Sequence, residues 1–581
     1  MLSRIMLRLL PVQVLLAAIG AVNGIVSSLF ASNYIGEAAM SAVALYFPIN
    51  MLLGALGFML FGGATILCGK YMGQGQREKL QNIFSLDLII AALISFVFIA
   101  AMLVMAIFGI TGFFTRDPQV RPLFHAYLLG QAIGLFPFLL GNQLSAFLSL
   151  QNNTRRTTAA GLAFIAANLV LNFLFVQLLH MGTFGLALAS SLGMWVFFLV
   201  QAQFFCSDRA LVRLSLHPLD WSEAADLISI GVPGALTNGY ETIRGLIVNK
   251  LITVFVGSVG LSAFAACNNF LMLFWAIPYG MMAVSRMLIS VADGEEDRQT
   301  LTDVMRVMFR RFLPIQCMIS VLIIAFAVPI THMFYHDPAD PVFMMTVWGF
   351  RIMPICMPLS VIGMHFVCYS QISRKRFLVH LLTILDGVAC VAGFTAILIP
   401  FLGIESVYAA NVLNGIVVVL TVIVYATVKN GHIPRTMDQL MTIPDSFGVS
   451  PAQRLDVSVR SVAEVVLVSE QIMNFCERRG IDSHRSSLAG LAMEEMAGNV
   501  VEHGFHKDRR HHSIDIRVAH KGDDLILRIK DDCRPFDPIQ QQKMMDPEDF
   551  TSNIGLRMIF KRATDIKYQS ILGMNVLTIR I

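Results

Sequence analysis

The sequence has little charge and no organised set of cysteines. Only 14% of its 581 residues are charged, whereas soluble globular chains have roughly 25%. The nine cysteines are scattered without a Cys-x-x-Cys pair, which excludes a disulfide framework or a thiolate zinc site as the organising feature. A net charge of +4 is too small to indicate a nucleic-acid partner without a clustered basic face. The chain is therefore not one large soluble protein.

Two further absences narrow the function. The sequence has no Walker A motif, which disfavours a primary ATP-driven pump. The apolar N-terminal block continues to about residue 30 without a small-residue cleavage site. We therefore expect a retained first helix rather than a signal peptide.

Long apolar blocks fill the sequence up to about Val428. A crossing of the bilayer needs about 20 apolar residues, and the blocks predict twelve crossings. They run approximately over 8–31, 45–69, 84–110, 121–149, 159–180, 184–206, 225–256, 260–291, 312–334, 342–370, 377–400 and 405–428. An even number of crossings puts both termini on one side of the membrane.

The short loops carry an uneven distribution of basic residues. Lysines and arginines such as Arg4, Lys70 and Arg374 gather on one side, and the other side has only Arg116 and Arg121. Since basic loops stay in the cytoplasm, we expect both termini and the C-terminal segment to be cytoplasmic. A bacterial cytoplasmic membrane protein is the predicted localisation.

The membrane half has a 6+6 plan with a weak internal repeat. Its similar breaks are GKYMGQGQREKL (69–80) and VADGEEDRQTL (291–301), and repeated halves around a central site are a common transporter plan.

Charged residues become common after Lys429, and prolines lie along this change in composition. The expected boundaries are a first six-helix bundle over 1–206, a connector over 207–224, a second bundle over 225–429, a linker over 430–450 and a soluble domain over 451–581.

Few ionisable residues fall inside the predicted crossings. Glu241 and Asp386 are the candidates for ion coupling, since burying a charge in the membrane is expensive. Arg244 lies one turn from Glu241, so an internal ion pair is the alternative. Asp87 is close to a basic loop and is interpreted as a helix-end residue. Asn168 and Asn172 are candidates either for lining a cavity or for hydrogen bonds between helices.

The membrane half resembles the multidrug and toxic compound extrusion (MATE) transporters. The similarity lies in YIGEAAMSAVALYFPI (34–49), in Asn168-Leu-Val-Leu-Asn172 with the following MGTFGLALASSLG (181–193), and in ISIGVPGALTNGYE (228–241). It implies two six-helix bundles, alternating access, and efflux of small amphipathic or cationic compounds coupled to H⁺ or Na⁺. Some members of that family carry a coupling Glu at the place of Glu241. Many carry an Asp in the first helix where this chain has Ser27, so coupling in the second bundle or a changed transport mode is expected.

The sequence after the linker predicts a two-layer α+β domain. Alternation predicts strands at 454–460, 513–519, 524–531, 566–571 and 575–580, and 3.6-residue periodicity predicts helices at 461–479, 483–503 and 555–563. Asp482 or Ser483 can cap the second helix. The predicted architecture is a layer of helices on a mostly antiparallel sheet.

Three segments of this domain carry candidate chemistry. Glu495, Asn499 and His503 are spaced to share one face of a helix, where a carboxylate and an amide oxygen could hold Mg²⁺. Asp531 ends a strand, where its carboxylate could accept a hydrogen bond from a purine amine. NIGLRMI (553–559) predicts a turn into a helix N-terminus, which favours phosphate.

In this order the segments resemble the N, G1 and G2 boxes of the Bergerat-fold (GHKL) ATPases, in particular the anti-sigma-factor serine kinases. The resemblance implies Mg-ATP as cofactor, with Glu495 activating water or a substrate serine, Asn499 binding Mg²⁺, Asp531 binding adenine, and His503, Asp537 and Gly555 at the nucleotide. An anti-anti-sigma-like protein is the implied partner. Both G1 glycines are missing from Asp531-Asp532-Cys533-Arg534-Pro535, and Asn553 replaces the first G2 glycine. A relic that uses the fold for protein contacts is the alternative.

The leading interpretation is a MATE-type efflux transporter with a cytoplasmic nucleotide-binding regulatory domain. The runner-up is a membrane-anchored serine kinase or anti-sigma-type regulator that uses the transporter fold as a sensor, so protein-serine kinase or weak ATPase activity over 451–581 stays open. A lipid-linked precursor flippase is the third alternative, since related families share the bundle plan.

Overall fold

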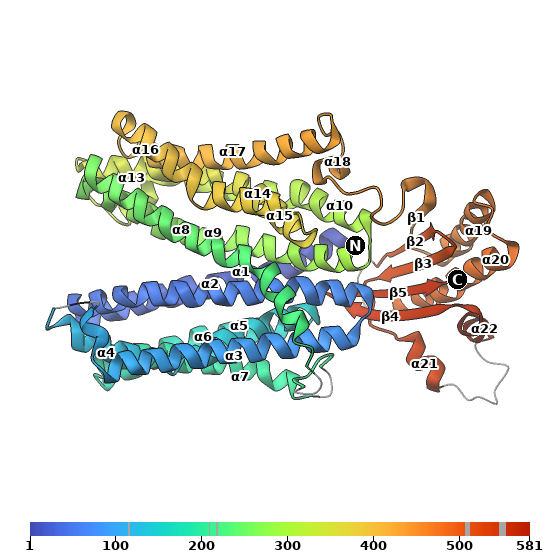
Figure 1. Cartoon of the computed structure of the whole chain (residues 1–581), viewed down its shortest axis with the longest axis horizontal. Coiled ribbons are helices and arrows are strands. Elements are labelled where there is room, and N and C mark those ends of the chain that lie inside the picture. The colour runs from blue at the N-terminus through green and yellow to red at the C-terminus, as the bar shows by residue number, and fades with distance from the viewer. Residues whose placement is uncertain (114, 116, 208–209, 216–218, 506–511, 545–553) are drawn as a thin grey trace.

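The computed structural model describes residues 1–113, 115, 117–207, 210–215, 219–505, 512–544 and 554–581. A long helical part comes first, and a small α+β domain at one of its ends completes the chain (Figure 1). We call the end of the helical part that contacts this domain the domain end.

The first bundle occupies the lower part of Figure 1. Its elements are α1 (Leu2–Phe30) with the π-helical turn η1 (Ala31–Ile35), α2 (Glu37–Gln74), α3 (Arg77–Ile107), the short η2 (Ile110–Phe113), α4 (Val120–Ala132), α5 (Leu135–Leu150), α6 (Thr154–Asn172), η3 (Phe173–Leu178) and α7 (Gly182–Phe205).

The second bundle lies beside the first. Its elements are α8 (Ser222–Phe255), α9 (Ser258–Gly294), α10 (Arg298–Val307), η4 (Met308–Phe312), α11 (Leu313–Ala325), α12 (Ala327–His332), α13 (Pro341–Ile352), η5 (Met353–Ile355), α14 (Cys356–Ile372), α15 (Arg376–Ile384), η6 (Leu385–Ala389), α16 (Cys390–Leu402) and α17 (Glu405–Asn430).

Ten helical segments of the described residues are long and apolar enough to span a membrane, or eleven if α4 and α5 form one span. These two helices meet at a 45° bend around Gly134, inside the predicted fourth crossing. The helix α8 falls short of the other spans in hydropathy because charged residues such as Glu241 and Arg244 interrupt it. The prediction of about twelve membrane helices in two bundles agrees with this arrangement, with α8 as the polar exception.

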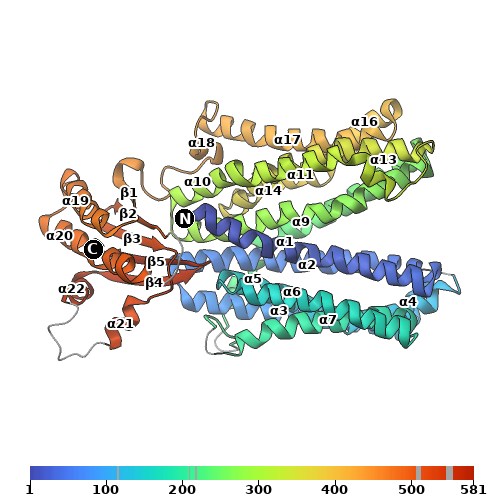
Figure 2. The same cartoon turned by 180° about the vertical axis from the view of Figure 1, so that it is seen from behind.

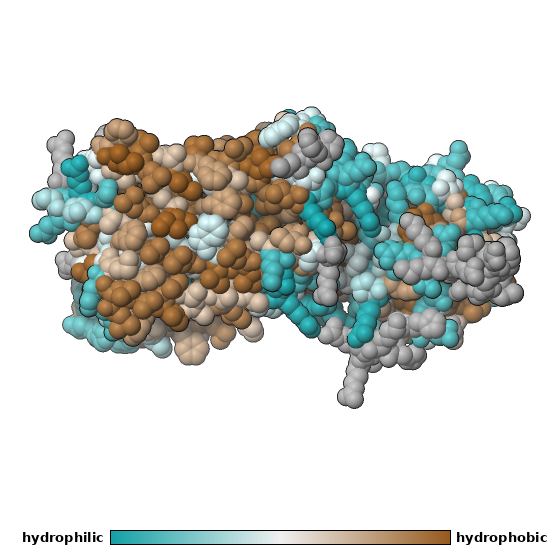
Figure 3. All heavy atoms as spheres, turned by 90° about the horizontal axis from the view of Figure 1, so that it is seen from below, coloured by the Kyte–Doolittle hydropathy of each residue, from teal (hydrophilic) through white to brown (hydrophobic). Residues whose placement is uncertain are grey.

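The surface agrees with a membrane location. Figure 3 shows a mostly hydrophobic face over the helical part, with hydrophilic side chains at its far end and at the junction with the C-terminal domain. A bilayer solvates such a band and leaves both polar margins in water.

Close backbone contacts join the two bundles at the domain end. A Cβ added at Gly231 of α8 would lie 2.0 Å from the carbonyl oxygen of Met59, and one at Gly63 of α2 would lie 2.1 Å from that of Leu227. Similarly, a Cβ added at Gly69 or Gly73 of α2, or at Gly294 of α9, would lie within 2.5 Å of an atom of the other helix. We call these five residues the glycine seam.

Two ion pairs lie beside the glycine seam. Lys70 is 3.7 Å from Asp293, and Lys79 is 3.6 Å from Glu223. Toward the other end, the pairs α1/α2 and α8/α9 diverge (Figures 1 and 2). There, no heavy atom of the described residues lies within 4 Å of the Cβ positions of Gly20, Gly24 and Gly239. The membrane half is therefore closed at the domain end.

The C-terminal domain is a five-stranded antiparallel sheet in the order β1-β2-β3-β5-β4 with helices on one face. Its strands are β1 (Arg454–Val459), β2 (Ile514–Lys521), β3 (Asp524–Asp531), β4 (Asp565–Ile571) and β5 (Met574–Arg580). The helical elements are α19 (Val462–Arg478), α20 (Ser483–Asn499), η8 (Val500–Gly504), α21 (Pro538–Met544) and α22 (Ile554–Arg562), preceded by η7 (Pro451–Gln453) and by α18 (Met437–Met441) in the linker. The predicted α+β architecture is confirmed.

Candidate functional site

The acidic candidates of the second bundle face each other. Asp386 lies in η6, where Asn414 of α17 donates to its Oδ1 at 2.7 Å. The Arg244 guanidinium of α8 donates to the Asp386 carbonyl oxygen at 3.1 Å. Arg244, Asp386 and the Tyr279 hydroxyl are all within electrostatic or hydrogen-bonding reach of Glu241. Two segments, α8 and η6, thus bring two carboxylates and one guanidinium together inside the bundle.

The first bundle contains a network of neutral amides. Asn168 donates to Asn23 at 3.0 Å, and Asn172 donates to Asn168 at 3.1 Å. Ser190 of α7 also donates to Asn23, at 3.1 Å. Both Asn168 and Asn172 are buried. These contacts place the two asparagines in a hydrogen-bonded network between α1, α6 and α7.

Asp87 lies deeper than the sequence suggested. Its interpretation as a helix-end residue is wrong, because it is fully buried well inside α3. Among the described residues, neither of its carboxylate oxygens has a hydrogen-bond partner. Burying a charge without a partner is expensive, so Asp87 joins Glu241 and Asp386 as a candidate for ion coupling.

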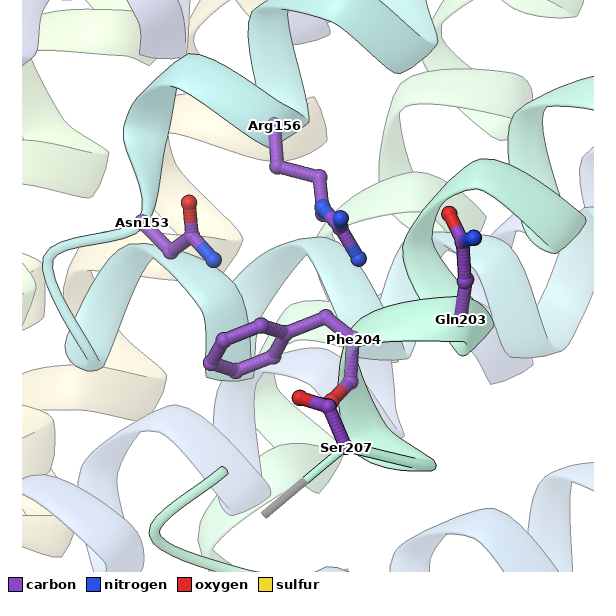
Figure 4. A pocket seen from close by; sticks show the side chains of 5 residues that line it. All are labelled: Asn153, Arg156, Gln203, Phe204 and Ser207. Carbon is purple, nitrogen blue, oxygen red and sulfur yellow. The ribbon is translucent and has the colours of Figure 1, made fainter. Parts of the chain in front are cut away.

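A pocket of about 350 Å³ lies at the domain end of α6 and α7 (Figure 4). Asn153, Arg156, Gln203, Phe204 and Ser207 line it. The Arg156 guanidinium lies over the Phe204 ring, 5.8 Å from its centre, so the pocket combines one cation with amides and a hydroxyl. None of these residues belongs to the site around Glu241 and Asp386.

In the C-terminal domain, α20 carries the first candidate residues. Glu495 lies so close to the start of α22 that a Cβ added at Gly555 would be 2.3 Å from its carboxylate. Asn499 ends α20, and the backbone then widens into the π-helical turn η8. His503 lies in η8, off the regular helical repeat that placed it on one face with Glu495 and Asn499, and its side chain lies outside the described residues.

Asp531 ends β3 and is held in a buried network. Its Oδ1 accepts hydrogen bonds from Asn575 at 2.7 Å and from the backbone N–H of Cys533 at 2.9 Å. Burial raises the pKa of Asp531, and these hydrogen bonds oppose that rise. Asn575 also accepts from Tyr568, whose hydroxyl oxygen accepts from the Phe536 N–H at 3.0 Å. This network fixes the loop from which the glycines are missing.

The sequence alone does not indicate a role for Asn575 or Tyr568, because they follow Asp531 by more than thirty residues and no local pattern links them to it.

Asp537, another predicted nucleotide residue, caps α21 by accepting from the Ile539 N–H at 2.9 Å. It lines a second pocket at the junction with the membrane half. Asn553 of the G2 segment lies outside the described residues.

His512 is buried beside the loop that follows β3. His512 lies 3.0 Å from Asp532, and Cys533 is close enough for the three to share a cation. The Arg4 guanidinium already pairs with Asp532 at 3.2 Å, which neutralises that carboxylate without a metal.

The residues present fit Mg-ATP in their donor set. Glu495 and Asn499 offer the hard oxygen ligands that Mg²⁺ prefers, and the N-terminus of α22 with Gly555 lies beside them. The hydrogen bonds that Asp531 accepts from Asn575 and Cys533 both fall on Oδ1. The loop after Asp531 fits the nucleotide less well, because it lacks the glycines that would permit close contact between its backbone and a ligand.

Comparison with protein families assigns both parts of the chain. The profile of the MatE family matches residues 16–174 and 233–376. The profile of the histidine kinase-like ATPase domain matches residues 458–581.

Known proteins and structures resemble the membrane half. The probable multidrug resistance protein NorM of Bacillus licheniformis is 23% identical over 36% of this chain and 49% of its own length. NorM of Listeria monocytogenes is 23% identical over 43% of this chain and 53% of its own length. These matches therefore span about half of each relative. The outward-facing conformation of a multidrug resistance MATE family transporter of the MOP superfamily superposes with a TM-score of 0.69, at 20% identity, over 76% of this chain and 97% of that one.

Proposed function

The chain belongs to the MatE family, and on that premise we propose that it is an ion-coupled efflux transporter for small amphipathic or cationic compounds. The observation that supports this most directly is the meeting of Glu241, Arg244 and Asp386 inside the second bundle. A carboxylate can bind H⁺ or Na⁺ in one state of the transporter and a cationic substrate in the other. It thereby couples the flux of the ion to the efflux of the substrate. The basic loops favour a cytoplasmic domain end in a bacterial membrane.

Changing Glu241 to glutamine is expected to reduce efflux to the level of cells without the protein. The amide keeps the shape of the side chain and removes its charge, so it can no longer exchange a coupling ion for substrate. Ethidium efflux from energised cells measures the effect. Glu405→Gln is the matched control, because Glu405 is an exposed carboxylate at the start of α17. Full efflux by Glu241→Gln would contradict the proposal.

The C-terminal domain belongs to the histidine kinase-like ATPase class, and we propose that it binds Mg-ATP and regulates the transporter. Asn499 would hold the metal and Asp531 the base, with the phosphates near the N-terminus of α22 and Gly555. Glu495 would accept a proton from an attacking hydroxyl, either of water or of a serine on an anti-anti-sigma-like partner. When bound, the nucleotide supplies the phosphoryl group for that attack.

Changing Asn499 to alanine is expected to weaken Mg-ATP binding about tenfold or more, since even indirect partners of a metal contribute about that much. Calorimetry on the full chain in nanodiscs measures the change. Asn474→Ala makes the same substitution on the exposed face of α19 and should bind as the wild type does. If the wild-type chain binds no Mg-ATP, the nucleotide part of the proposal is wrong and the domain acts through protein contacts.

A further inference from the structure

The sheet of the C-terminal domain has two different faces. Leu525, Leu527 and Ile529 of β3 are buried in the core shared with the helix layer. Because side chains alternate along a strand, Arg528 and Lys530 point the other way, and both contact Glu295 of the membrane half. Asp531 and the contacts of Arg528 and Lys530 with the membrane half therefore lie on opposite faces of one sheet.

The basic face of the sheet binds an acidic loop of the second bundle. This docking loop, residues 295–297, connects α9 and α10. The Lys530 ammonium is 2.7 Å from Glu295 and 2.9 Å from Asp297, and Arg517 also pairs with Asp297. The Glu295 and Asp297 side chains are 2% and 0% exposed. Solvent does not screen such a buried network as it screens surface pairs.

The linker ties the domain to the second bundle as well. Arg298, the first residue of α10, donates to the Asp438 carboxylate and to the Pro444 carbonyl oxygen, both at 2.8 Å. Arg454 at the start of β1 donates to Gln299 at 2.7 Å. The domain thus follows any movement of the second bundle.

The other end of the sheet reaches the first bundle. The turn between β4 and β5 carries Leu572, whose N–H donates to the Leu150 carbonyl oxygen at 3.3 Å. Ile571, Leu572 and Met574 are buried in the apolar core of the membrane half. Arg4 of α1 adds the ion pair with Asp532. One compact domain therefore binds both bundles at the end where the glycine seam holds them together.

We propose that the C-terminal domain is a latch that keeps the domain end of the transporter closed by binding both bundles at once. Opening of this end separates the bundles, and a domain fixed to both must first release one of them. The turn at Leu572 is the contact that releases, because the linker and the docking loop both hold the domain to the second bundle. The inference rests on the proposed function, since it assigns a regulation to the same alternating-access cycle.

The nucleotide candidates adjoin the latch contacts along the same strands. Asp531 follows Lys530 in β3, and Asn575 lies between Met574 and Val576 in β5. A ligand that binds Asp531 or Asn575 and shifts either side chain therefore acts on β3 and β5, the strands that also contact the membrane half.

Spin labels on the two bundles test the latch in the full chain in nanodiscs. Glu78 at the start of α3 and Arg376 at the start of α15 are exposed at the domain end, and each is replaced by cysteine. Cys206, Cys317 and Cys533 are changed to serine, because the remaining cysteines are buried. Pulsed electron resonance then reports the distance between the bundles.

Two ways of releasing the latch are compared. Leu572→Glu puts a charge into the apolar contact with the first bundle. A protease site inserted at the exposed residues 445–446 allows the linker of the intact protein to be cut, after which the noncovalent contacts are dissociated in high salt and the freed domain is removed by size-exclusion chromatography. Both are expected to raise the fraction of molecules open at the domain end about tenfold, a shift typical between a minor and a major state. Gln471→Glu, on the exposed face of α19, adds the same charge away from the membrane half and should keep the wild-type distance.

The latch is refuted if both Leu572→Glu and the cleaved protein keep the closed distance. Cleavage guards against misfolding of the Leu572 variant, since the protein is folded before it is cut. Proton-driven ethidium transport in proteoliposomes is measured on the same samples. If no sample transports ethidium, the proposed efflux function is wrong, and the distances still decide whether the domain holds the bundles together.

Discussion

Replacing Gly231 by alanine is expected to force the two bundles apart at the domain end. The new Cβ would lie 2.0 Å from the Met59 carbonyl oxygen, and a backbone atom cannot move aside as a flexible side chain can. Overpacking of this kind destabilises a packed contact by about 1–3 kcal/mol. The closed state should therefore lose about one to two powers of ten in population, measured with the labels at residues 78 and 376.

Gly239→Ala on the same helix is the control for this prediction. Among the described residues, no heavy atom lies within 4 Å of its Cβ position, and alanine is favoured over glycine in a helix by about 1 kcal/mol. The control should thus leave the population of the closed state unchanged, whereas Gly231→Ala lowers it. A wild-type distance in Gly231→Ala would show that the backbone contact with α2 does not keep this end closed.

The sequence predicts the elements of the C-terminal domain well because each is set by local patterns. The alternation of RLDVSVR gives β1, and Asp482 caps α20 by accepting from the Arg485 N–H at 3.0 Å. The apolar blocks likewise locate the long helices. The sequence does not predict the bend between α4 and α5, since the apolar block runs through it without interruption.

The contacts between the two parts of the chain depend on tertiary structure. Arg528 and Lys530 alternate with buried residues in β3, which is the pattern of a strand with one face in water. In the structure, Lys530 instead binds Glu295, which lies 235 positions earlier. The segment 291–301 reads as a polar break between helices, and nothing local indicates that its acids are buried under a sheet.

The sequence predicts the candidate site residues to different degrees, because some depend on local patterns and others on tertiary packing. Glu241 and Asp386 stand out as charges in apolar surroundings, and helical periodicity and strand ends locate Glu495 and Asp531. The burial of Asp87 depends on the helices around α3, and the role of Asn575 depends on the pairing of β3 with β5. Both follow from packing between segments that are distant in the sequence.

Changing Asp297 to asparagine is expected to undock the C-terminal domain from the second bundle. Burial alone would raise the pKa of Asp297, but the charges of Lys530, Arg517 and Arg528 outweigh it and hold that pKa well below its usual range. Asp297 also caps α10 by accepting from the Thr300 N–H at 2.9 Å, and asparagine caps a helix equally well. The substitution therefore removes the charge and keeps the cap.

Removing one partner of a buried ion pair costs about 3–5 kcal/mol, which lowers the docking equilibrium constant by about two to four powers of ten. Hydrogen exchange of the full chain measures this at two places, the docking loop and the turn at Leu572. Undocking of the whole domain speeds exchange at both. Acid should act in the same direction, because a carboxyl with a lowered pKa favours docking above its ordinary range near about 3.9 and loses that contribution as the pH falls below it.

Lys521→Gln is the control at the same contact, since Lys521 of β2 pairs with Glu296 of the docking loop and both side chains are exposed, at 46% and 53%. Exposed pairs contribute about 0–1 kcal/mol, so this variant should exchange nearly as the wild type does. Equal exchange in Asp297→Asn and the wild type would mean that the apolar turn and the linker hold the domain without the ion network. Faster exchange at the docking loop alone would mean that the turn at Leu572 docks independently, and the two contacts would then not act as one latch.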